Sequence, residues 1–352
     1  MLLFFLVVAG LYFARPFLVP VCFGGLLAML FLPASRWLQS KGLPRGVAIL
    51  LCILFFVSIC AGIIWLISWQ VTDLTSEASH IEQKIKDMIK EIKGYINKNF
   101  GISSSQQDQL LNSQQQAGSS ITQGILSVIT SGVMSFLIDF ILVLVYIFLF
   151  MYYRTHIKKF VLQLVPEKQK NNARQIIADI QKVSQQYLTG LGMMIVGLWI
   201  MYSIGFSIVE LKYALFFAVL CGLLEIIPFV GNLTGNLLAI LMVIIQGGSM
   251  GMIVGVVITY AIVQFLQTYI LEPLVVGAEV NINPLFTIIV LVAGQLVWGI
   301  AGMVMAIPLL GIMKIICDHI EPLKPYGFLI GRESKKKTGL FGKLKRNPST
   351  KS

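Results

Sequence analysis

The sequence predicts an all-α, polytopic membrane protein with about seven or eight membrane segments, and three observations lead to this fold class. Of the 352 residues, 57% are hydrophobic and only 12% are charged, whereas a soluble domain has roughly 45–50% apolar and 25% charged residues. Of the 27 Lys and Arg residues, 24 lie in four polar stretches, at 34–45, 71–120, 154–182 and 317–352. The apolar runs between these stretches repeatedly exceed the roughly 20 residues that a helix needs to cross a bilayer.

The same composition excludes several classes of protein. A water-soluble enzyme is excluded because too few charged residues exist to solvate its surface. The net charge of +11 would form a basic face in a nucleic-acid-binding protein, but here the cations lie between the apolar runs. The lipid bilayer, and not a nucleic acid, is therefore the expected partner.

No cofactor or metal is expected from the cysteines and histidines. The five cysteines include no CxxC pair, and four of them lie within apolar runs, which favours packing over metal ligation. The sequence also lacks HExxH, GxSxG and P-loop motifs. The protein is therefore not expected to be an enzyme, and any transport is expected to be secondary, driven by the gradient of the solute or of a coupled ion.

The N-terminal membrane segments, residues 1–70, begin with an apolar stretch at 2–32 that Arg15 and Pro16 interrupt. Proline removes a backbone donor, and an arginine in mid-span is costly. Two segments broken at this point are therefore favoured over the alternative of one long kinked helix. Residues 46–69 then form a clear span that ends in two interfacial tryptophans.

Residues 71–120 are predicted to form an extracytoplasmic segment. Apolar residues recur at heptad-like spacing between Ile81 and Tyr95, which predicts an amphipathic helix, and a Ser- and Gln-rich loop follows it. This helix lies either on the surface of the protein or membrane, or in a contact between subunits. We expect a homo-oligomer.

A long membrane helix is predicted at 121–153, followed by a basic amphipathic linker at 154–187 and a further span at 188–209. Basic loops mark the cytoplasmic side of a membrane protein. The loop at 34–45, the linker and the basic tail at 317–352 are therefore placed in the cytoplasm. We expect a multi-pass protein of the bacterial inner membrane, with its C-terminal tail against anionic lipid headgroups.

The segment 188–316 is predicted to be a transport core of broken helices or re-entrant hairpins. A broken backbone at membrane depth survives only where protein or a water-filled cavity surrounds it, and transporters present such breaks to a solute near the midplane. We expect two helical hairpins, from the interrupted runs at 213–248 and 270–311, each of which ends in a Gly-rich turn before an apolar helix. The segments 213–248 and 284–316 either cross fully or re-enter. The candidate pathway residues at the interruptions are Pro228, Gly231, Asn232, Asn236, Pro273, Gly277, Asn283 and Pro284.

Three acidic residues embedded in apolar sequence, Asp139, Glu225 and Glu272, complete the candidate pathway. An acid at the centre of a bilayer costs about 2.5–3.5 kcal/mol on insertion scales, so each is a functional hypothesis. Glu225 is expected either to accept hydrogen bonds from backbone amides freed at the break or to change protonation during transport. Asp139 has the alternative of a structural carboxylate, and Glu272 that of a position at the rim.

Three stretches together resemble the autoinducer-2 exporter family, also called the PerM-like permeases. They are LVPEKQKNNARQIIADIQKVSQQYLTG at 164–190, LLEIIPFVGNLTGN at 223–236 and the run from LEPLVVGAEV to MAIPL at 271–309. The Glu-x-x-Pro-x-x-Gly element of the family corresponds to Glu225, Pro228 and Gly231. A second block corresponds to Pro273, Gly277 and Pro284, and its Gly-rich close to Gly299, Gly302 and Pro308.

The resemblance covers nearly the whole chain and implies a multi-pass inner-membrane protein. Some members export the quorum-sensing furanone precursor, and others exchange sodium or lithium for protons. The chain differs from the family pattern because it begins almost directly in apolar sequence. From this difference we expect that Met1 is an internal start site. It also carries Asn283-Pro284 where His-Pro is frequent, which speaks against a proton role at that position.

Three hypotheses of function follow. The first is a secondary transporter that exports a small polar solute such as autoinducer-2, with Glu225 and the two asparagines Asn232 and Asn236 at the translocation site. The second is a monovalent cation/proton antiporter that uses Asp139, Glu225 and Glu272 as ion-binding carboxylates. The third is a non-transporting membrane scaffold that binds a partner through the heptad-like stripe.

Overall fold

The computed structural model describes residues 2–76, 121–227, 230–276 and 282–332. The described residues are almost entirely helical, and the one bridge found among them joins Ile282 and Gly331. Six helices are long and apolar enough to cross a membrane, and two shorter apolar helices accompany them. This confirms the predicted polytopic helical fold. The heptad-like stripe at 81–95 and the basic tail from 333 onward lie outside the described residues.

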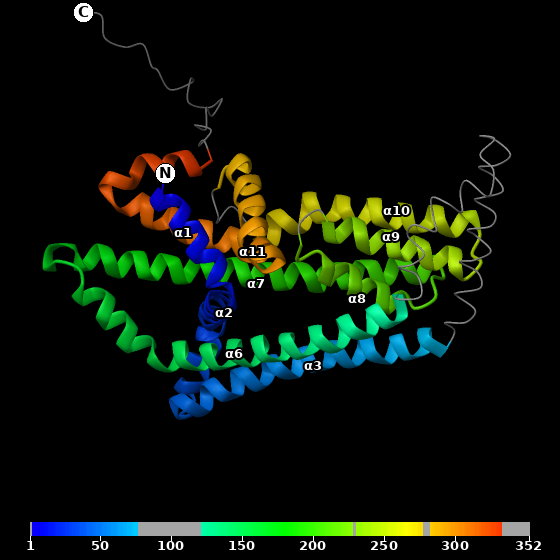
Figure 1. Ribbon diagram of the computed structural model, residues 1–352, viewed down its shortest axis with the longest axis horizontal. Helices are drawn as coiled ribbons and strands as arrows, with labels where there is room; N and C mark the ends of the chain where they lie inside the picture. The colour runs from blue at the N-terminus through cyan, green and yellow to red at the C-terminus, as the bar shows by residue number, and fades with distance from the viewer. Residues whose placement is uncertain (1, 77–120, 228–229, 277–281, 333–352) are drawn as a thin grey trace, which may run out of the picture.

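The N-terminal segment breaks where the sequence predicts it. One residue, Ala14, separates helix α1 (Leu2–Phe13) from α2 (Arg15–Ser40). Pro16 lies in the first turn of α2, where its missing backbone donor costs nothing. Helix α3 (Arg45–Ser76) then lies beside α6 (Ile121–Gln163), and α2 packs against both of them (Figure 1). A small apolar core of Ala28, Ile49, Ile147 and Met151 joins these three helices.

The longest helix of the second half is α7 (Lys170–Ile208), which follows α6 after the short 3₁₀ turn η1 (Glu167–Gln169). The predicted linker at 154–187 is divided between two helices, because α6 continues to Gln163 and α7 begins at Lys170. The amphipathic part of the linker leads directly into the span at 188–209, since α7 runs unbroken for 39 residues, about 58 Å at 1.5 Å per residue. This helix exceeds a 30 Å bilayer core, and α8, α10, η2 and α11 all pack against it.

The first predicted hairpin is formed by α8 (Ala214–Leu224) and α9 (Val230–Ile245), which are joined by the break after Glu225. The backbone amide of Lys212 donates to the side-chain oxygen of Gln246 at 3.1 Å, so the two ends of the hairpin meet. The 11 and 16 residues of these helices extend about 16 Å and 24 Å, less than the bilayer core of about 30 Å. The structure therefore favours re-entry over full crossing.

Helix α10 (Met250–Leu266) returns through the bundle and ends in the π-helix η2 (Gln267–Val276), while α11 (Pro284–His319) contains the second hairpin. At Gly299 the backbone takes φ 62° and ψ −143°, a conformation that is accessible essentially to glycine alone. A Cβ atom built on Gly302 would lie 2.0 Å from the carbonyl oxygen of Gly294, although residues eight apart in a straight helix are separated by about 12 Å. The chain therefore reverses at Gly299.

The two hairpins thus exist as predicted, but they reverse at different features. The first turns between the end of α8 at Leu224 and the start of α9, and not in the Gly-rich turn at 246–258. The second turns at Gly299, inside its Gly-rich run. Pro284 does not hold a break open in mid-helix, because it occupies the first turn of α11, and the side chain of Asn283 caps that helix by accepting from the amide of Leu285 at 3.0 Å.

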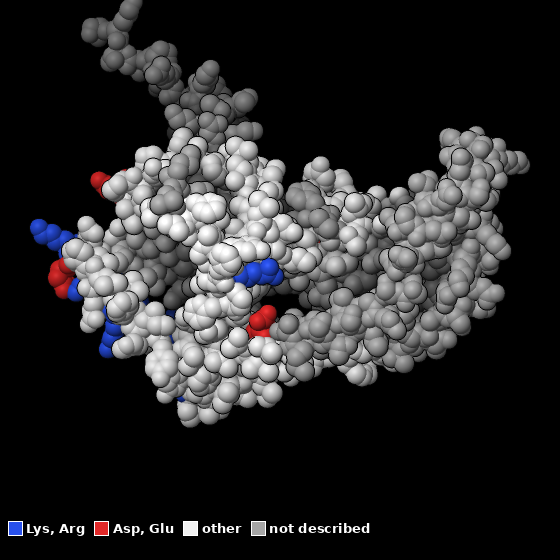
Figure 2. Space-filling view, in the orientation of Figure 1, with Lys and Arg blue, Asp and Glu red and all other residues white. Residues whose placement is uncertain are grey.

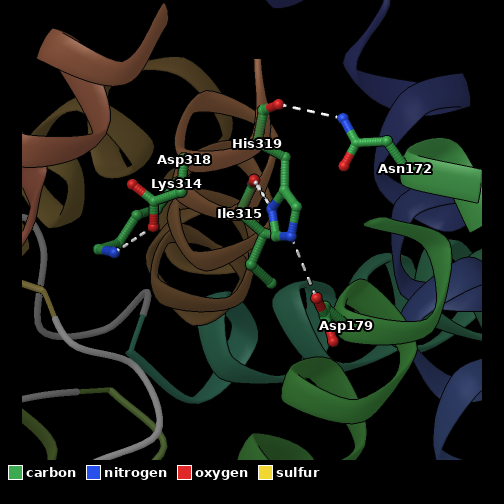
Figure 3. Close-up of polar contacts among 6 residues, drawn as sticks. All are labelled: Asn172, Asp179, Lys314, Ile315, Asp318 and His319. Carbon is green, nitrogen blue, oxygen red and sulfur yellow. Dashed lines mark hydrogen bonds and ion pairs between the residues drawn. The ribbon is translucent and has the colours of Figure 1, made fainter. Parts of the chain in front are cut away.

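The C-terminal end of α11 is tied to the start of α7 (Figure 3). His319 Nε2 lies 3.4 Å from a carboxylate oxygen of Asp179, and its Nδ1 contacts the Ile315 carbonyl at 2.9 Å. The side-chain amide of Asn172 donates to the His319 carbonyl at 3.2 Å. Two further elements close this end of the molecule: the 3₁₀ turn η4 (Glu321–Leu323) and helix α12 (Lys324–Ile330).

Candidate functional site

A group of polar side chains lies inside the main apolar core, where α7, α9, α10 and η2 meet. The side chains of Tyr202, Asn232, Asn236 and Gln267 are 1%, 6%, 4% and 7% exposed. Apolar residues such as Phe206, Val243 and Val263 surround them. Burying polar groups is costly unless they are paired, so the hydrogen bonds of this group decide what it can do.

Hydrogen bonds connect three helices through these side chains. The Tyr202 hydroxyl donates to Asn232 Oδ1 at 3.1 Å and accepts from Asn236 Nδ2 at 3.2 Å. Asn236 Nδ2 also lies 2.9 Å from the Asn232 carbonyl oxygen. On the other side, Asn232 Nδ2 donates to Gln264 of α10, whose own amide donates to Thr268 at 3.3 Å. We call Tyr202, Asn232, Asn236, Gln264 and Gln267, with Glu225, the polar network.

Glu225 brings the break of the first hairpin into the polar network. Its Oε1 accepts a hydrogen bond of 2.8 Å from the side-chain amide of Gln267, at the first position of η2. The Glu225 carboxylate also lies near the Tyr202 hydroxyl and the Cys221 thiol. A carboxylate at the end of α8 is thus held against a π-helix, an element that occurs frequently at functional sites.

The geometry of α9 explains why its two asparagines point inward. Asn232 and Asn236 are four residues apart and therefore lie on one face of the helix. Gly231 and Gly235 lie beside them and allow α8 to approach closely: a Cβ atom on Gly231 would lie 1.6 Å from the Leu224 carbonyl oxygen. Leu233 and Leu237 lie about 100° around the helix from them and are 66% and 63% exposed. The hairpin therefore presents amides to the core and leucines to the outside.

Two acceptors in the polar network have no hydrogen-bond partner among the described residues. They are Asn236 Oδ1 and Gln267 Oε1, and both atoms are buried. A buried acceptor without a partner costs about 1–3 kcal/mol, and in native proteins such groups usually belong to functional sites or bind water or ions. The polar network can therefore accept hydrogen bonds from the hydroxyl groups of a solute, or coordinate a cation.

The length of α9 predicts the depth of the polar network in the membrane. Asn236 precedes Gln246, at the open end of the hairpin, by ten residues of mostly helical chain, which extend about 15 Å. This is half the thickness of a bilayer core of about 30 Å. Transporters place their solute sites at this level, between discontinuous helices.

Comparison with known proteins identifies the family. Residues 1–321 match the family described as "AI-2E family transporter". The chain belongs to the AI-2E transporter family. It is 25% identical over 313 residues to "Putative transport protein YrrI" of Bacillus subtilis (strain 168), covering 86% of each chain. It is also 25% identical over 327 residues to "Putative transport protein YueF" of the same bacterium, covering 88% of this chain and 87% of that one.

A third relative comes from another bacterium. The AI-2E chain is 25% identical over 310 residues to "Putative transport protein MT0215" of Mycobacterium tuberculosis (strain CDC 1551 / Oshkosh), covering 82% of this chain and 79% of that one. The protein is therefore a multi-pass membrane transporter of a bacterial family. Membership confirms the resemblance that the sequence motifs indicate.

Within the AI-2E fold, some predicted pathway residues come together. Glu225, Asn232 and Asn236 belong to the polar network, and Gly231 allows the hairpin that positions them. Glu272 and Pro273 lie on the backbone of η2, which starts with Gln267, but their side chains are outside the described part of the chain. Pro228 and Gly277 lie outside it altogether.

Other predicted residues lie elsewhere in this transporter. Asp139 is exposed on α6, a helix whose contacts are with α2, α3 and α7. Asn283 and Pro284 form the start of α11, which packs on α7, α2 and the C-terminal helices. The structure thus does not bring these three residues to the polar network, and a role for them in transport stays a prediction.

Three members of the polar network are missed by the sequence analysis: Tyr202, Gln264 and Gln267. The two glutamines carry a signal, because they are uncharged polar residues three apart in an otherwise apolar run, and such residues in membrane helices often form hydrogen bonds across helices. Tyr202 carries none, since tyrosine is common in membrane helices. No group of three or more His, Cys, Asp or Glu residues that could hold a metal occurs within the described ranges.

Proposed function

We propose that the protein is a secondary transporter that exports a small, uncharged, hydroxylated solute of the autoinducer-2 type, with the polar network in its translocation site. The observation that carries this proposal is the pair of buried acceptors, Asn236 Oδ1 and Gln267 Oε1, in a network of amides and a phenol. A site built to hydrogen-bond hydroxyl groups leaves its own groups unpaired when the solute lacks them, and it therefore rejects apolar analogues strongly.

The distribution of charge supports an orientation with the C-terminus in the cytoplasm. Lys and Arg gather at the end of the molecule where α6 leads into α7 (Figure 2). Cytoplasmic loops of membrane proteins carry such an excess of basic residues. In this orientation the open end of the first hairpin, near Gln246, faces the outside of a bacterial inner membrane, and the polar network lies between the two compartments.

A second candidate function, cation/proton antiport, is favoured by the contact of Glu225 with Gln267. Carboxylate and amide oxygens are the ligands that small hard cations prefer, and the buried Gln267 Oε1 belongs to the same amide that donates to Glu225. Asp139, the other carboxylate of this hypothesis with a described side chain, lies apart from the polar network. An antiporter built on this structure would therefore rely on Glu225.

Everted membrane vesicles that contain the protein test the two functions together. We expect wild-type vesicles to accumulate isotope-labelled autoinducer-2, and we expect the addition of sodium or lithium to leave an imposed proton gradient unchanged. Glu225→Gln keeps the hydrogen-bonding shape but removes the charge, so it should retain a measurable share of solute accumulation. Glu210→Gln, an exposed glutamate in the turn before α8, is the matched control.

The opposite pattern would replace the proposal with its alternative. Sodium or lithium would then dissipate the proton gradient, Glu225→Gln would abolish this exchange, and Glu210→Gln would not. If neither the solute nor the cations move in vesicles that contain folded protein, the scaffold hypothesis is the one that remains.

A further inference from the structure

A cavity of about 390 Å³ lies between α2, α6 and α7, far from the polar network. Its walls are mainly apolar and include Leu32 of α2, Phe150 of α6 and Ile180 of α7. Two cationic side chains, Arg154 and Lys158, stand one helical turn apart on α6 and also line it. The volume falls in the range of about 300–1,000 Å³ that is typical of ligand pockets.

Arg154 is not electrically compensated in this position. One terminal nitrogen donates to the neutral Gln39 side chain at 3.2 Å, and the other is buried without a hydrogen-bond partner. Arg36 and Arg45 lie close enough for their charges to repel it. Arg45 itself donates to the Met151 carbonyl at 2.9 Å and leaves its own Nε buried and unpartnered. Two cations therefore line the apolar cavity, and two more, Arg36 and Arg45, lie near Arg154.

The neighbouring acidic residues are engaged elsewhere. Asp179, which is next to Ile180 of the cavity wall, pairs with His319 (Figure 3). Glu167 pairs with Lys170. Within the ranges that the structure describes, no ion pair involves Arg36, Arg45, Arg154 or Lys158. A buried neutral donor without a partner costs about 1–3 kcal/mol, and a charged donor costs more. The arrangement therefore favours the binding of an anion beside Arg154.

Aromatic residues place this end of the cavity at the membrane surface. Trp37 of α2 and Tyr152 and Tyr153 of α6 are exposed beside the arginines, with exposed fractions between 43% and 61%. Trp and Tyr concentrate where the hydrocarbon of a bilayer meets its headgroups. The cations therefore lie at headgroup level, and the apolar part of the cavity extends from them along the helices.

We propose that the cavity between α2, α6 and α7 binds an anionic phospholipid, whose phosphate contacts Arg154 and Lys158 and whose acyl chain fills the apolar walls. Basic pockets between membrane helices on the cytoplasmic side suit such headgroups. The lipid would bridge three helices and stabilise their arrangement. It is not the transported solute, because Ile180 and Tyr202 are 22 residues apart on α7, about 33 Å along the helix.

The test compares lipids that share acyl chains but differ in charge. The purified full-length protein in a non-ionic detergent is titrated with phosphatidylglycerol, with phosphatidylethanolamine or with inorganic phosphate. Two quantities are measured: the midpoint of thermal unfolding, and the number of bound lipids by native mass spectrometry. We expect a saturable rise of the midpoint and one tightly bound lipid with phosphatidylglycerol alone. Equal effects of phosphatidylethanolamine, or a full effect of inorganic phosphate, would overturn the proposal.

Matched variants locate the site. Arg154→Gln with Lys158→Gln should raise the phosphatidylglycerol concentration for the half-maximal effect at least tenfold. The control, Lys159→Gln with Arg174→Gln, removes the same charge from exposed positions of α6 and α7 and should leave that concentration unchanged. Equal losses in both double variants would show non-specific surface attraction and overturn the proposal.

A second variant keeps every charge and fills the cavity. A side chain at Gly25, on the α2 wall, has room to extend toward Phe150, whose ring lies 3.8 Å from the added Cβ atom. Gly25→Leu should therefore weaken phosphatidylglycerol binding at least fivefold even if the arginine variant fails to fold. Unchanged binding in Gly25→Leu would contradict an acyl chain in this cavity.

Discussion

Replacing Gly231 with alanine is expected to lower the thermal midpoint of the purified protein by about 3–6 °C, which corresponds to the roughly 1–3 kcal/mol or more that overpacking costs. The Cβ atom of the alanine would lie 1.6 Å from the carbonyl oxygen of Leu224, a main-chain atom that no rotamer change can move. Either α9 shifts away from α8 or the break after Glu225 opens. Both responses also displace Asn232 and Asn236 from the polar network.

The control for this substitution is Gly192→Ala in α7. Gly192 is helical and exposed, and nothing lies within 4 Å of an added Cβ atom. Alanine favours the helix by about 1 kcal/mol over glycine, so this variant should be at least as stable as the wild type. The midpoint can be followed by the loss of monodisperse protein on heating in detergent. Equal stability of the two variants would contradict the close approach of α8 and α9.

Replacing Asn236 with leucine is expected to reduce solute accumulation in everted vesicles at least tenfold per folded protein, or about 1.4 kcal/mol. Leucine is similar in size to asparagine but lacks the side-chain amide. The substitution therefore removes the Nδ2 group that donates to the Tyr202 hydroxyl and the Asn232 carbonyl oxygen. It also removes the buried, unpartnered Oδ1. Because leucine is itself favourable in a membrane interior, the amount of folded protein should change little.

Two variants bracket this result. Tyr202→Phe removes one hydroxyl but leaves both asparagine amides in place, so its accumulation should fall between the wild type and Asn236→Leu. Leu237→Ala changes the next residue of α9, on the exposed face, and should transport like the wild type. A normal rate in Asn236→Leu, or an equal loss in Leu237→Ala, would remove the polar network from the translocation site.

Much of the fold follows from local chemistry that a sequence displays. Membrane helices are predictable because the bilayer requires a long apolar run for each crossing, and the breaks at Ala14, after Leu224 and at Pro284 follow from proline and glycine preferences. The placement of Glu225, Asn232 and Asn236 among polar partners is predictable for a related reason, because polar residues within an apolar membrane segment are costly unless they are paired.

The remaining features depend on long-range packing, which a sequence does not display. The second hairpin turns inside a Gly-rich run that the sequence marks as an interruption, but the sequence does not show which glycine carries the reversal. The backbone of Gly299 and the contact between Gly294 and Gly302 locate it. Tyr202 joins the polar network because α7 passes Asn232, 30 residues later in the chain. Asp139, like Glu225, is an acidic residue within an apolar run. In contrast to Glu225, it is exposed on α6, a helix whose described residues contact α2, α3 and α7 and none of the other helices of the polar network.

The account depends on water and solute reaching Asn232 and Asn236 during transport, and cysteine labelling measures this directly. In a cysteine-free background, cysteines at 232 and 236 should react with a hydrophilic thiol reagent, and autoinducer-2 should slow the reaction. Cysteines at 233 and 237, on the exposed leucine face, should stay unreactive, and Ser249→Cys, in the exposed turn before α10, should react quickly. If 232 and 236 stay as unreactive as 233 and 237 from both sides of the membrane while Ser249→Cys is labelled, the polar network is a dry packing element and not a passage.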